Sequence, residues 1–322
     1  MKKFLVLLVL ILSVKGYCQE TLEKQLNDLL GDISVQDTSK STFKISLGLG
    51  NRRFSINNNT LNADQSENKI VINPTVGYFH KSGFSISASA FAFTDNSNFK
   101  FYQFALTPAY EYTTGKNLAA AISYTRFFQA DAYTQSASPV QNDLYGKIYF
   151  KKPWMQPGVS LGYGSGKYKQ ITQVDTVVRI NNQLVHYRFK DTASVKMTWF
   201  NISPSIQHEF EFEKVFSKND GFMFNPELLV NIGSGTYDEK HSGSGLASLV
   251  NGNGRRGKRI SDKSSASEVT PLQLESLAIN IDMEYGIGNF AISPNIYLDY
   301  YLPATTSNRF SGIYQLNFIY RF

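Results

Sequence analysis

Large apolar and polar side chains alternate along the last nine residues, and this pattern constrains the chain more than any other feature. Successive side chains of a strand point to opposite faces, so the stretch has one apolar face and one polar face. The apolar face consists of Tyr314, Leu316, Phe318, Tyr320 and Phe322, and the polar face carries Gln315, Asn317 and Arg321. The pattern predicts a strand with water on one side and lipid or a protein core on the other.

This strand, which closes the chain on Phe322, resembles the C-terminal signature of bacterial outer-membrane β-barrel proteins. The resemblance implies that Phe318, Tyr320 and Phe322 form the assembly signal read by the barrel-assembly machinery, which would be a partner during biogenesis. An ordinary edge strand of a soluble β-protein would show the same alternation. The interpretation therefore depends on the rest of the chain.

Residues 1–18 have the layout of a secretory signal peptide. Lys2 and Lys3 precede an apolar run from Phe4 to Val14 that is too short to span a bilayer. Small residues before Gln19 suggest cleavage at that point, as in many exported Bacteroidota proteins that this region resembles. Lipidation of Cys18 is the competing interpretation, and the bulky Tyr17 before it argues against it.

Export removes two classes of chemistry from consideration. The chain has one cysteine, inside residues 1–18, so the mature protein would have no disulfide and no cysteine-based metal site or nucleophile. Taking Lys2, Lys3 and Lys15 away from the formal net charge of +6 leaves +3. The basic charge is therefore no argument for binding nucleic acid, and no nucleic-acid partner is expected.

After residue 41 the chain reads as alternating segments of barrel-strand length, typical of an all-β, antiparallel, up-and-down transmembrane β-barrel of about 12 strands over residues 42–322. We expect strands at 43–54, 69–80, 84–94, 99–112, 118–128, 142–151, 158–170, 194–212, 222–234, 272–286, 290–302 and 310–322. Five of these segments contain an X-Pro step, which we interpret as shaping the sheet at bulges or at the cost of a ladder bond.

An even strand count places both ends of a barrel on one side of the membrane, and the resemblance at Phe322 puts that side in the periplasm. Connector lengths agree, because such barrels have short periplasmic turns and long outer loops. The long connectors are 55–68, 129–141, 171–193 and 235–271, and they alternate with short ones. We expect 171–193 to form a hairpin beyond the membrane, and 235–271 to be a loop whose basic cluster, 255–259, could meet lipopolysaccharide phosphates.

Parity assigns side chains to the outer wall or the interior. An aromatic girdle near the periplasmic end is expected at Tyr110, Trp154, Phe210 and Tyr285. Small residues, such as those at 48, 50, 77, 85, 87 and 89, line the interior of the first strands. The second half supplies the candidate lumen-lining residues Lys147, Lys151, Glu209, Glu227, Asp282 and Asp299. Such charges are either hydrated or form ion pairs with one another, and the sequence does not decide between these alternatives.

Residues 19–41 precede the barrel and differ from it in the spacing of their apolar residues. Aliphatic residues at helical spacing predict a short periplasmic amphipathic helix within residues 20–34. It could plug the lumen, lie on the membrane surface or dock on a periplasmic or outer-membrane protein partner, and a frayed export leader would look similar. Outer-membrane lipid and lipopolysaccharide are the other expected partners.

The sequence contains no signature of an enzyme or a cofactor site. Outer-membrane enzymes place a histidine with a serine or an acid at a defined membrane level, and none of His80, His186, His208 and His241 meets that description. We see no zinc spacing, calcium loop or phosphate-binding glycine loop, so no metal and no cofactor is expected. The sequence favours a small-solute channel or uptake protein, with a non-conducting accessory or scaffold subunit as the alternative.

Overall fold

A computed structural model describes residues 40–51, 70–95, 98–129, 140–180, 183–249, 258–303 and 309–322. Within these ranges the chain forms strands and turns, without a helix, and no helix of the kind that crosses a membrane is found there. The expected signal peptide and the helix at 20–34 lie outside the described residues. The strands are β1 (Thr42–Gly50), β2 (Val71–Phe79), β3 (Phe84–Asp95), β4 (Asn98–Tyr112), β5 (Leu118–Gln129), β6 (Asn142–Phe150), β7 (Gln156–Ile180), β8 (Gln183–Gln207), β9 (Phe210–Glu213), β10 (Asp220–Leu249), β11 (Lys258–Ile287), β12 (Phe290–Tyr301) and β13 (Phe310–Arg321).

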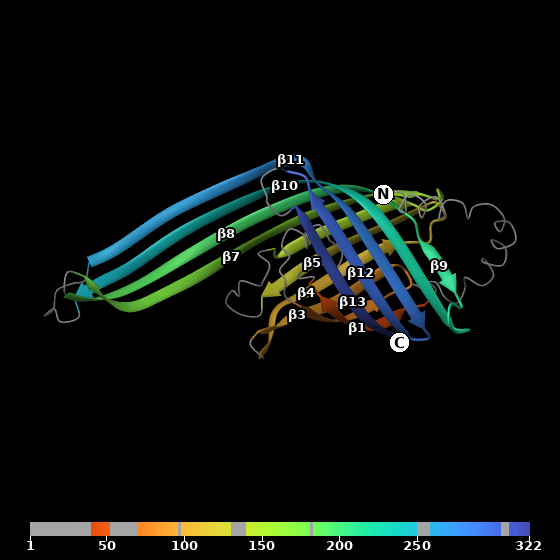
Figure 1. Ribbon diagram of the computed structural model, residues 1–322, viewed down its shortest axis with the longest axis horizontal. Helices are drawn as coiled ribbons and strands as arrows, with labels where there is room; N and C mark the ends of the chain where they lie inside the picture. The colour runs from red at the N-terminus through yellow and green to blue at the C-terminus, as the bar shows by residue number, and fades with distance from the viewer. Residues whose placement is uncertain are drawn as a thin grey trace, which may run out of the picture.

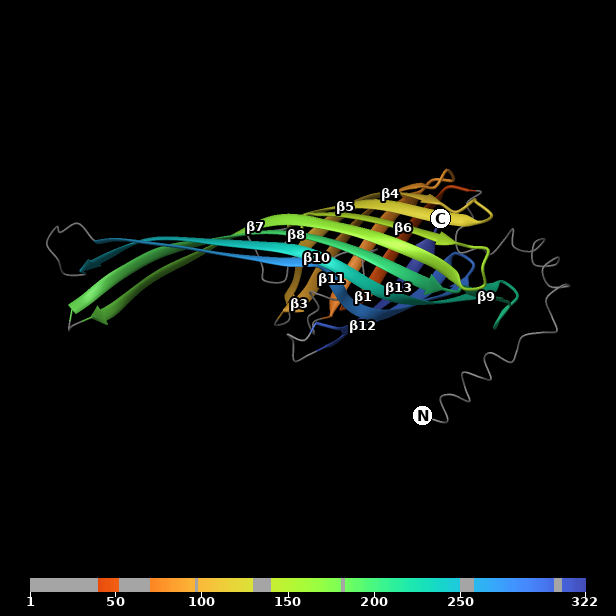
Figure 2. The same cartoon turned by 90° about the horizontal axis from the view of Figure 1, so that it is seen from above.

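The strands close into a single antiparallel barrel (Figures 1 and 2). Each strand pairs with the next along the chain, and β13 pairs with β1 from Lys44↔Arg321 to Gly50↔Gln315. The short strand β9 continues β8 after His208 and Glu209 and pairs with the same partner, β10. The predicted segment 194–212 is thus interrupted, and the closed ring has 12 barrel strands, as the sequence predicts.

The X-Pro steps interrupt the ladder without shifting the register. Pairing of β2 with β3 skips from Ile72↔Ala92 to Thr75↔Ser89 across Pro74, which has no N–H to donate. The side-chain amide of Asn73 donates instead to the carbonyl of Ala90 at 2.7 Å. The register shifts lie in the pairing of β3 with β4 and of β10 with β11, away from these five X-Pro steps, so of the two interpretations the structure shows the lost ladder bond.

Two neighbouring strands approach closely where β1 meets β13. A Cβ atom at Gly48 would collide with the side-chain amide of Gln315, and one at Gly50 would collide with the carbonyl oxygen of Tyr314. The glycines therefore let the inward Gln315 lie flat against β1 at the strand pair that closes the ring. Asn51, which follows β1, also bonds to β13. Its side chain donates to Gly312 O at 2.7 Å and accepts from Tyr314 N–H at 2.7 Å.

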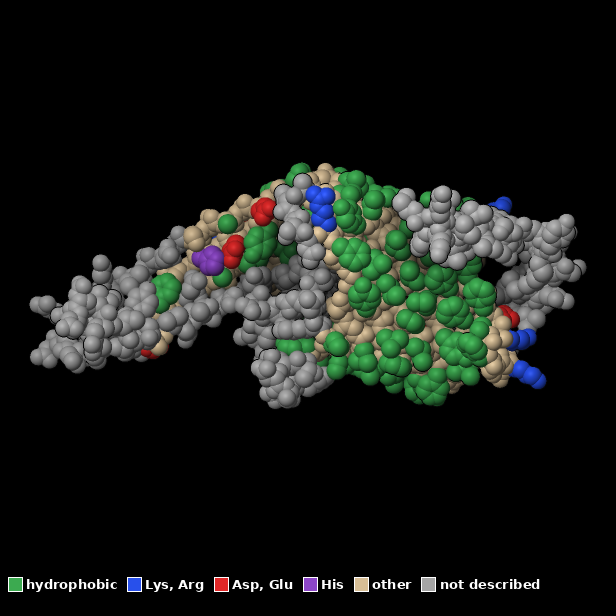
Figure 3. Space-filling model, in the orientation of Figure 1, with side chains coloured by type: hydrophobic (Ala, Val, Ile, Leu, Met, Phe, Trp, Pro, Cys, Tyr) green, Lys and Arg blue, Asp and Glu red, His purple; other side chains and the backbone are tan. Residues whose placement is uncertain are grey.

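Side chains separate by polarity across the barrel wall. Along β1 the outward Phe43, Ile45 and Leu47 are each exposed by 42 %, and apolar groups cover the outer surface in the same way in Figure 3. The inward positions instead bury Ser, Thr, Asn, Gln and carboxylate side chains. This arrangement is the reverse of a soluble protein, and it fits a wall that meets hydrocarbon.

Strands β7, β8, β10 and β11 continue far beyond the barrel and form a four-stranded extension (Figure 1). The β7–β8 pairing runs out to Ile180↔Gln183, so the hairpin predicted over 171–193 is confirmed. The predicted loop 235–271 is wrong for most of its length, because β10 runs to Leu249 and β11 starts at Lys258. The basic cluster falls partly outside the described residues, and Lys258 and Arg259 belong to β11.

Both described ends of the barrel lie on one side. The N–H of Phe322 donates to Phe43 O at 2.9 Å, which places the start of β1 beside the end of β13. The short connectors, such as 80–83 and 288–289, lie at this termini end, and the extension leaves from the opposite end.

Candidate functional site

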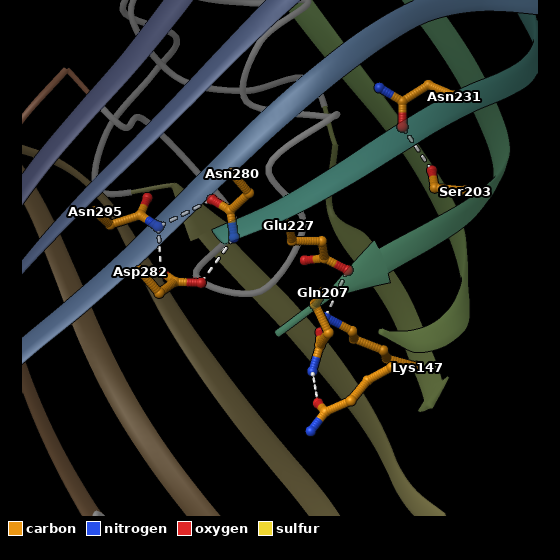
Figure 4. A network of polar contacts seen from close by, with 9 residues as sticks. Lys147, Ser203, Gln207, Glu227, Asn231, Asn280, Asp282 and Asn295 are labelled. Carbon is orange, nitrogen blue, oxygen red and sulfur yellow. Dashed lines mark hydrogen bonds and ion pairs between the residues drawn. The ribbon is translucent and has the colours of Figure 1, made fainter. Parts of the chain in front are cut away.

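An ion pair near the termini end joins strands that are not neighbours. Lys147 on β6 places its Nζ 2.8 Å from Glu227 Oε1 on β10 and donates to Gln207 Oε1 on β8 at 2.8 Å (Figure 4). The contact with Glu227 is off the line of a hydrogen bond and is chiefly electrostatic. The side chains of Lys147 and Glu227 are 21 % and 6 % exposed, so the pair is largely withdrawn from water.

A second polar group surrounds Asn231 on β10, which is fully buried. Its Nδ2 donates to Ser276 Oγ at 2.8 Å and Tyr297 OH at 2.9 Å, and lies 3.3 Å from Asp299 Oδ1. Ser203 donates to the Asn231 carbonyl oxygen at 2.7 Å, from the other side. Four strands thus share one amide, and Asp299 is held by hydroxyl and amide donors.

Asp282 lies in a third group, between β11 and β12. Its carboxylate accepts from Asn280 Nδ2 at 2.7 Å and from the side-chain amide of Asn295 (Figure 4). Asn295 also donates to Asn280 Oδ1 at 3.1 Å. The three side chains form a closed set of donors and acceptors on the interior face.

Further cations lie close to the termini end. Arg321 Nη2 lies 2.6 Å from Glu284 Oε1, and Lys44 Nζ lies 4.2 Å from the ring centroid of Phe79. Lys151 donates to the carbonyl of Thr113 at 2.6 Å, so this lumen candidate is tied to a turn. The interior cations are Lys44, Lys147, Lys151 and Arg321, and the more numerous interior carboxylates are Glu111, Asp143, Glu209, Glu211, Glu227, Glu275, Asp282, Glu284 and Asp299.

The other half of the interior carries an apolar cluster that sequence reasoning missed. The small-residue lining predicted for the first strands gives way, toward the extension, to large rings. Their side chains are 1–7 % exposed, so water barely reaches them. The apolar cluster comprises Val71, Phe91, Phe93, Tyr102, Ala105, Phe127, Val140 and Trp199, with Met197 against it.

The bulge in the pairing of β3 with β4 changes the parity on β4 alone, where Tyr102 is the extra residue, whereas Phe91 and Phe93 keep the inward parity of Ser85 and Ser89 on β3. A bulge adds a residue on one strand, so inward and outward positions exchange along that strand beyond it. Tyr102 and Gln103 on β4 are both buried as a result, although they are adjacent in sequence. Gln103 is fully buried, and neither atom of its amide has a hydrogen-bond partner among the described residues.

Aromatic side chains gather on the outer wall at the termini end. Phe210 stacks on Phe224 with 5.9 Å between the ring centroids, and the ring centroids of Trp154 and His208 are 4.7 Å apart. The Nδ1 atom of His208 lies 2.5 Å from the backbone oxygen of Trp154. Tyr110 is 46 % exposed in the same band. The residues expected as a girdle therefore lie near the termini end, and their place at a membrane interface stays a prediction.

Tyr285 has a second role in a turn. It donates to Asp220 Oδ2 at 2.7 Å, and the same oxygen accepts from the N–H groups of Phe216 and Ser217, each at 2.9 Å. Desolvation acts to raise the pKa of Asp220, but the Tyr285 hydroxyl and these N–H groups together hold it below its usual range. The ionised carboxylate thus fixes the turn between β9 and β10.

The aromatic residues expected as the assembly signal are packed together at the closing strand. Phe322 lies 4.6 Å from Tyr320 and 5.7 Å from Phe43, measured between ring centroids. Tyr320 also meets Phe290 at 4.6 Å, and Phe318 is exposed on the wall. Their role in assembly stays a prediction.

One histidine and serine pair emerges from the structure. His80 Nδ1 lies 2.8 Å from Ser82 Oγ and also accepts from Ser82 N–H at 3.2 Å, in the exposed turn between β2 and β3. The ring nitrogen therefore holds the turn instead of facing the lipid wall. Among the described residues no cluster of three His, Cys, Asp or Glu side chains could hold a metal ion.

No protein-family model matches the chain, and no curated protein matches it. Solved structures that it resembles are outer-membrane barrels. They include a bacterial polysaccharide outer membrane secretin (10% identity, TM-score 0.34, 88% of this chain and 98% of that one) and LpxR from Salmonella typhimurium (9%, 0.31, 87% and 99%). The Pseudomonas putida toluene transporter TodX is similar at 8% identity and a TM-score of 0.32, over 88% of each chain. These resemblances concern the fold alone.

Proposed function

We propose that this protein is an integral outer-membrane β-barrel that works as a small-solute channel or uptake protein, with the termini end of the barrel in the periplasm. The observation that carries the proposal is the segregation of side chains across a closed ring, apolar outside and polar inside. Apolar groups such as Ile45 and Leu47 would meet lipid, and a polar interior would let a solute cross without meeting hydrocarbon.

The apolar cluster suggests how the lumen of such a channel would be closed in its resting state. Rings at this level are almost free of water contact, and an apolar constriction blocks ion flow by excluding water. In this proposal the lumen is shut at the cluster and opens when rings such as Phe91 and Trp199 move aside. The polar groups around Lys147 and Asn231 would then contact the solute.

Single-channel recording in planar bilayers tests the proposal. Wild-type protein should give rare, brief current steps, and a Phe91→Ala, Trp199→Ala variant should give frequent or long-lived steps because the apolar barrier is reduced. Phe128→Ala with Tyr163→Ala is the matched control, since both rings face the wall and are 49 % and 46 % exposed. Equal behaviour of the two double variants would contradict a barrier at the cluster.

The four-stranded extension favours one further candidate function, a non-conducting accessory or scaffold subunit. Beyond the barrel, β7 and β11 each have an edge with no partner strand in the described part of the chain. An open edge can accept a strand from another chain. Electrical silence of wild type and of Phe91→Ala, Trp199→Ala, with both shown to be folded, would favour this function over the channel.

A further inference from the structure

The outward face of β8 changes character within four residues where the barrel passes into the extension. Phe200 lies in an apolar row with its partner Tyr163 on β7, and Thr198 follows on the same face. Next on this face comes Lys196, opposite Lys167 on β7. The sequence from apolar to hydroxyl to basic side chains marks the level at which a lipid-facing wall ends and head groups begin.

The pairing of Lys167 with Lys196 is electrostatically unfavourable. The two lysines are directly opposite on antiparallel strands, both are exposed, and like charges in this position destabilise a sheet. Neither ammonium group has an ion pair within the part of the chain that the structure describes. A bound anion between them would remove the repulsion.

The same face carries two more exposed lysines. Lys190 lies six residues from Lys196 on β8, so it points the same way, and Lys240 on β10 follows Asp238, the partner of Lys196, by two residues. Two carboxylates lie on this face: Asp238, which accepts a hydrogen bond from Ser267, and the exposed Asp175 on β7. The four lysines exceed these two carboxylates by two charges.

The opposite face of the extension has the other sign. Glu239 accepts from Tyr237 OH at 3.5 Å and contacts His241 Nε2 at 2.8 Å. Figure 3 shows acidic and histidine side chains on the extension, without a described lysine or arginine among them. The lysines whose side chains the structure describes in the extension therefore lie on the face that continues the lipid-facing wall.

We propose that this basic face, defined by Lys167, Lys190, Lys196 and Lys240, binds the phosphate groups of the phosphorylated glycolipid in the outer leaflet. Lysine is a phosphate-binding point charge, and charges near an anionic membrane surface each add to binding. The apolar wall directly below would contact the acyl chains of the same lipid. The inference rests on the outer-membrane location proposed above, but not on conduction.

Native mass spectrometry of the full-length protein in detergent tests the inference, with bisphosphorylated lipid A and its dephosphorylated form as probes. Wild type should retain the bisphosphorylated lipid at least about tenfold better than Lys167→Gln, Lys196→Gln, Lys240→Gln. The control variant, Lys81→Gln, Lys116→Gln, Lys218→Gln, removes the same charge from exposed turns at the termini end and should bind as wild type does.

Two results would overturn the inference. Equal loss in the control variant would mean that net charge and not this face attracts the lipid, and equal retention of both lipid forms would exclude phosphate recognition. A chain that stays monomeric in water without detergent would instead refute the outer-membrane location itself. A barrel that binds the lipid but carries no current would leave this inference standing and contradict the channel.

Discussion

Buried polar side chains in the interior stabilise the barrel through their partners, and the pair formed by Lys147 and Glu227 is an example. Each charge is mostly shielded from water, so each depends on the other and on Gln207. Removing one member of a buried pair leaves the other uncompensated, which costs more than the pair itself contributes. The free energy of unfolding is therefore most sensitive to one-sided substitutions here.

We expect Glu227→Gln to lower the free energy of unfolding by about 1–3 kcal/mol, because Lys147 keeps some water contact and the full cost of a buried charge does not apply. Urea unfolding in lipid vesicles, followed by tryptophan fluorescence, measures this. Adding Lys147→Gln should restore part of the loss. Glu239→Gln on the half-exposed extension is the control, with an expected change under about 0.5 kcal/mol. An unchanged midpoint for Glu227→Gln would contradict the structural role.

At the scale of strands, alternation and connector length were enough to predict the closed ring, and they were not enough to predict where strands end. β10 and β11 continue through glycine- and serine-rich sequence that lacks apolar alternation, because hydrogen bonding to a neighbouring strand and not a buried face extends them. The apolar cluster escaped prediction although Phe91 and Phe93 follow the inward parity of β3, because alternation gives the face of a side chain and not its contacts across the interior. At Tyr102 a bulge on β4 also turns two adjacent residues inward, and one sequence does not mark its position.

The interior candidates show the same limit. Parity alone identifies Lys147, Glu227, Asp282 and Asp299 as inward, but their partners come from strands that are distant in sequence. Asn231 connects β8, β10, β11 and β12, and nothing in its local sequence distinguishes it from other strand asparagines. Contacts across the sheet depend on register, which the sequence specifies only approximately.

The extension should be dispensable for barrel closure, since every strand pair of the ring also has contacts within the barrel. Replacing residues 171–192 and 241–264 each by Asn-Gly joins paired residues, Gln170↔Ala193 and Lys240↔Ser265, through two-residue turns that keep the register. The truncated protein should keep a heat-dependent shift in gel mobility, the property expected of a closed barrel. Loss of that shift would mean that the extension contributes to folding.

For the whole molecule, the excess of carboxylates inside the ring predicts the sign of the current that an open lumen would carry. Lys147 and Arg321 already have acidic partners, whereas Glu209 and Glu211 near the termini end have no cation within 4.0 Å among the described residues. Rings of acidic side chains favour cations. The open-state variant Phe91→Ala, Trp199→Ala should therefore pass cations in preference to anions.

The reversal potential in a potassium chloride gradient measures this preference. Adding Glu209→Gln and Glu211→Gln to the open-state variant should shift the reversal potential toward zero, because the negative charge of this carboxyl pair leaves the mouth of the lumen. Adding Glu268→Gln, an exposed carboxylate on the extension, makes the matched control and should leave the reversal potential unchanged. Anion preference in the open-state variant, or an equal shift in the control, would show that the interior carboxylates do not govern the current. The first outcome would also mean that the paired interior cations, and not the free carboxylates, face the solute.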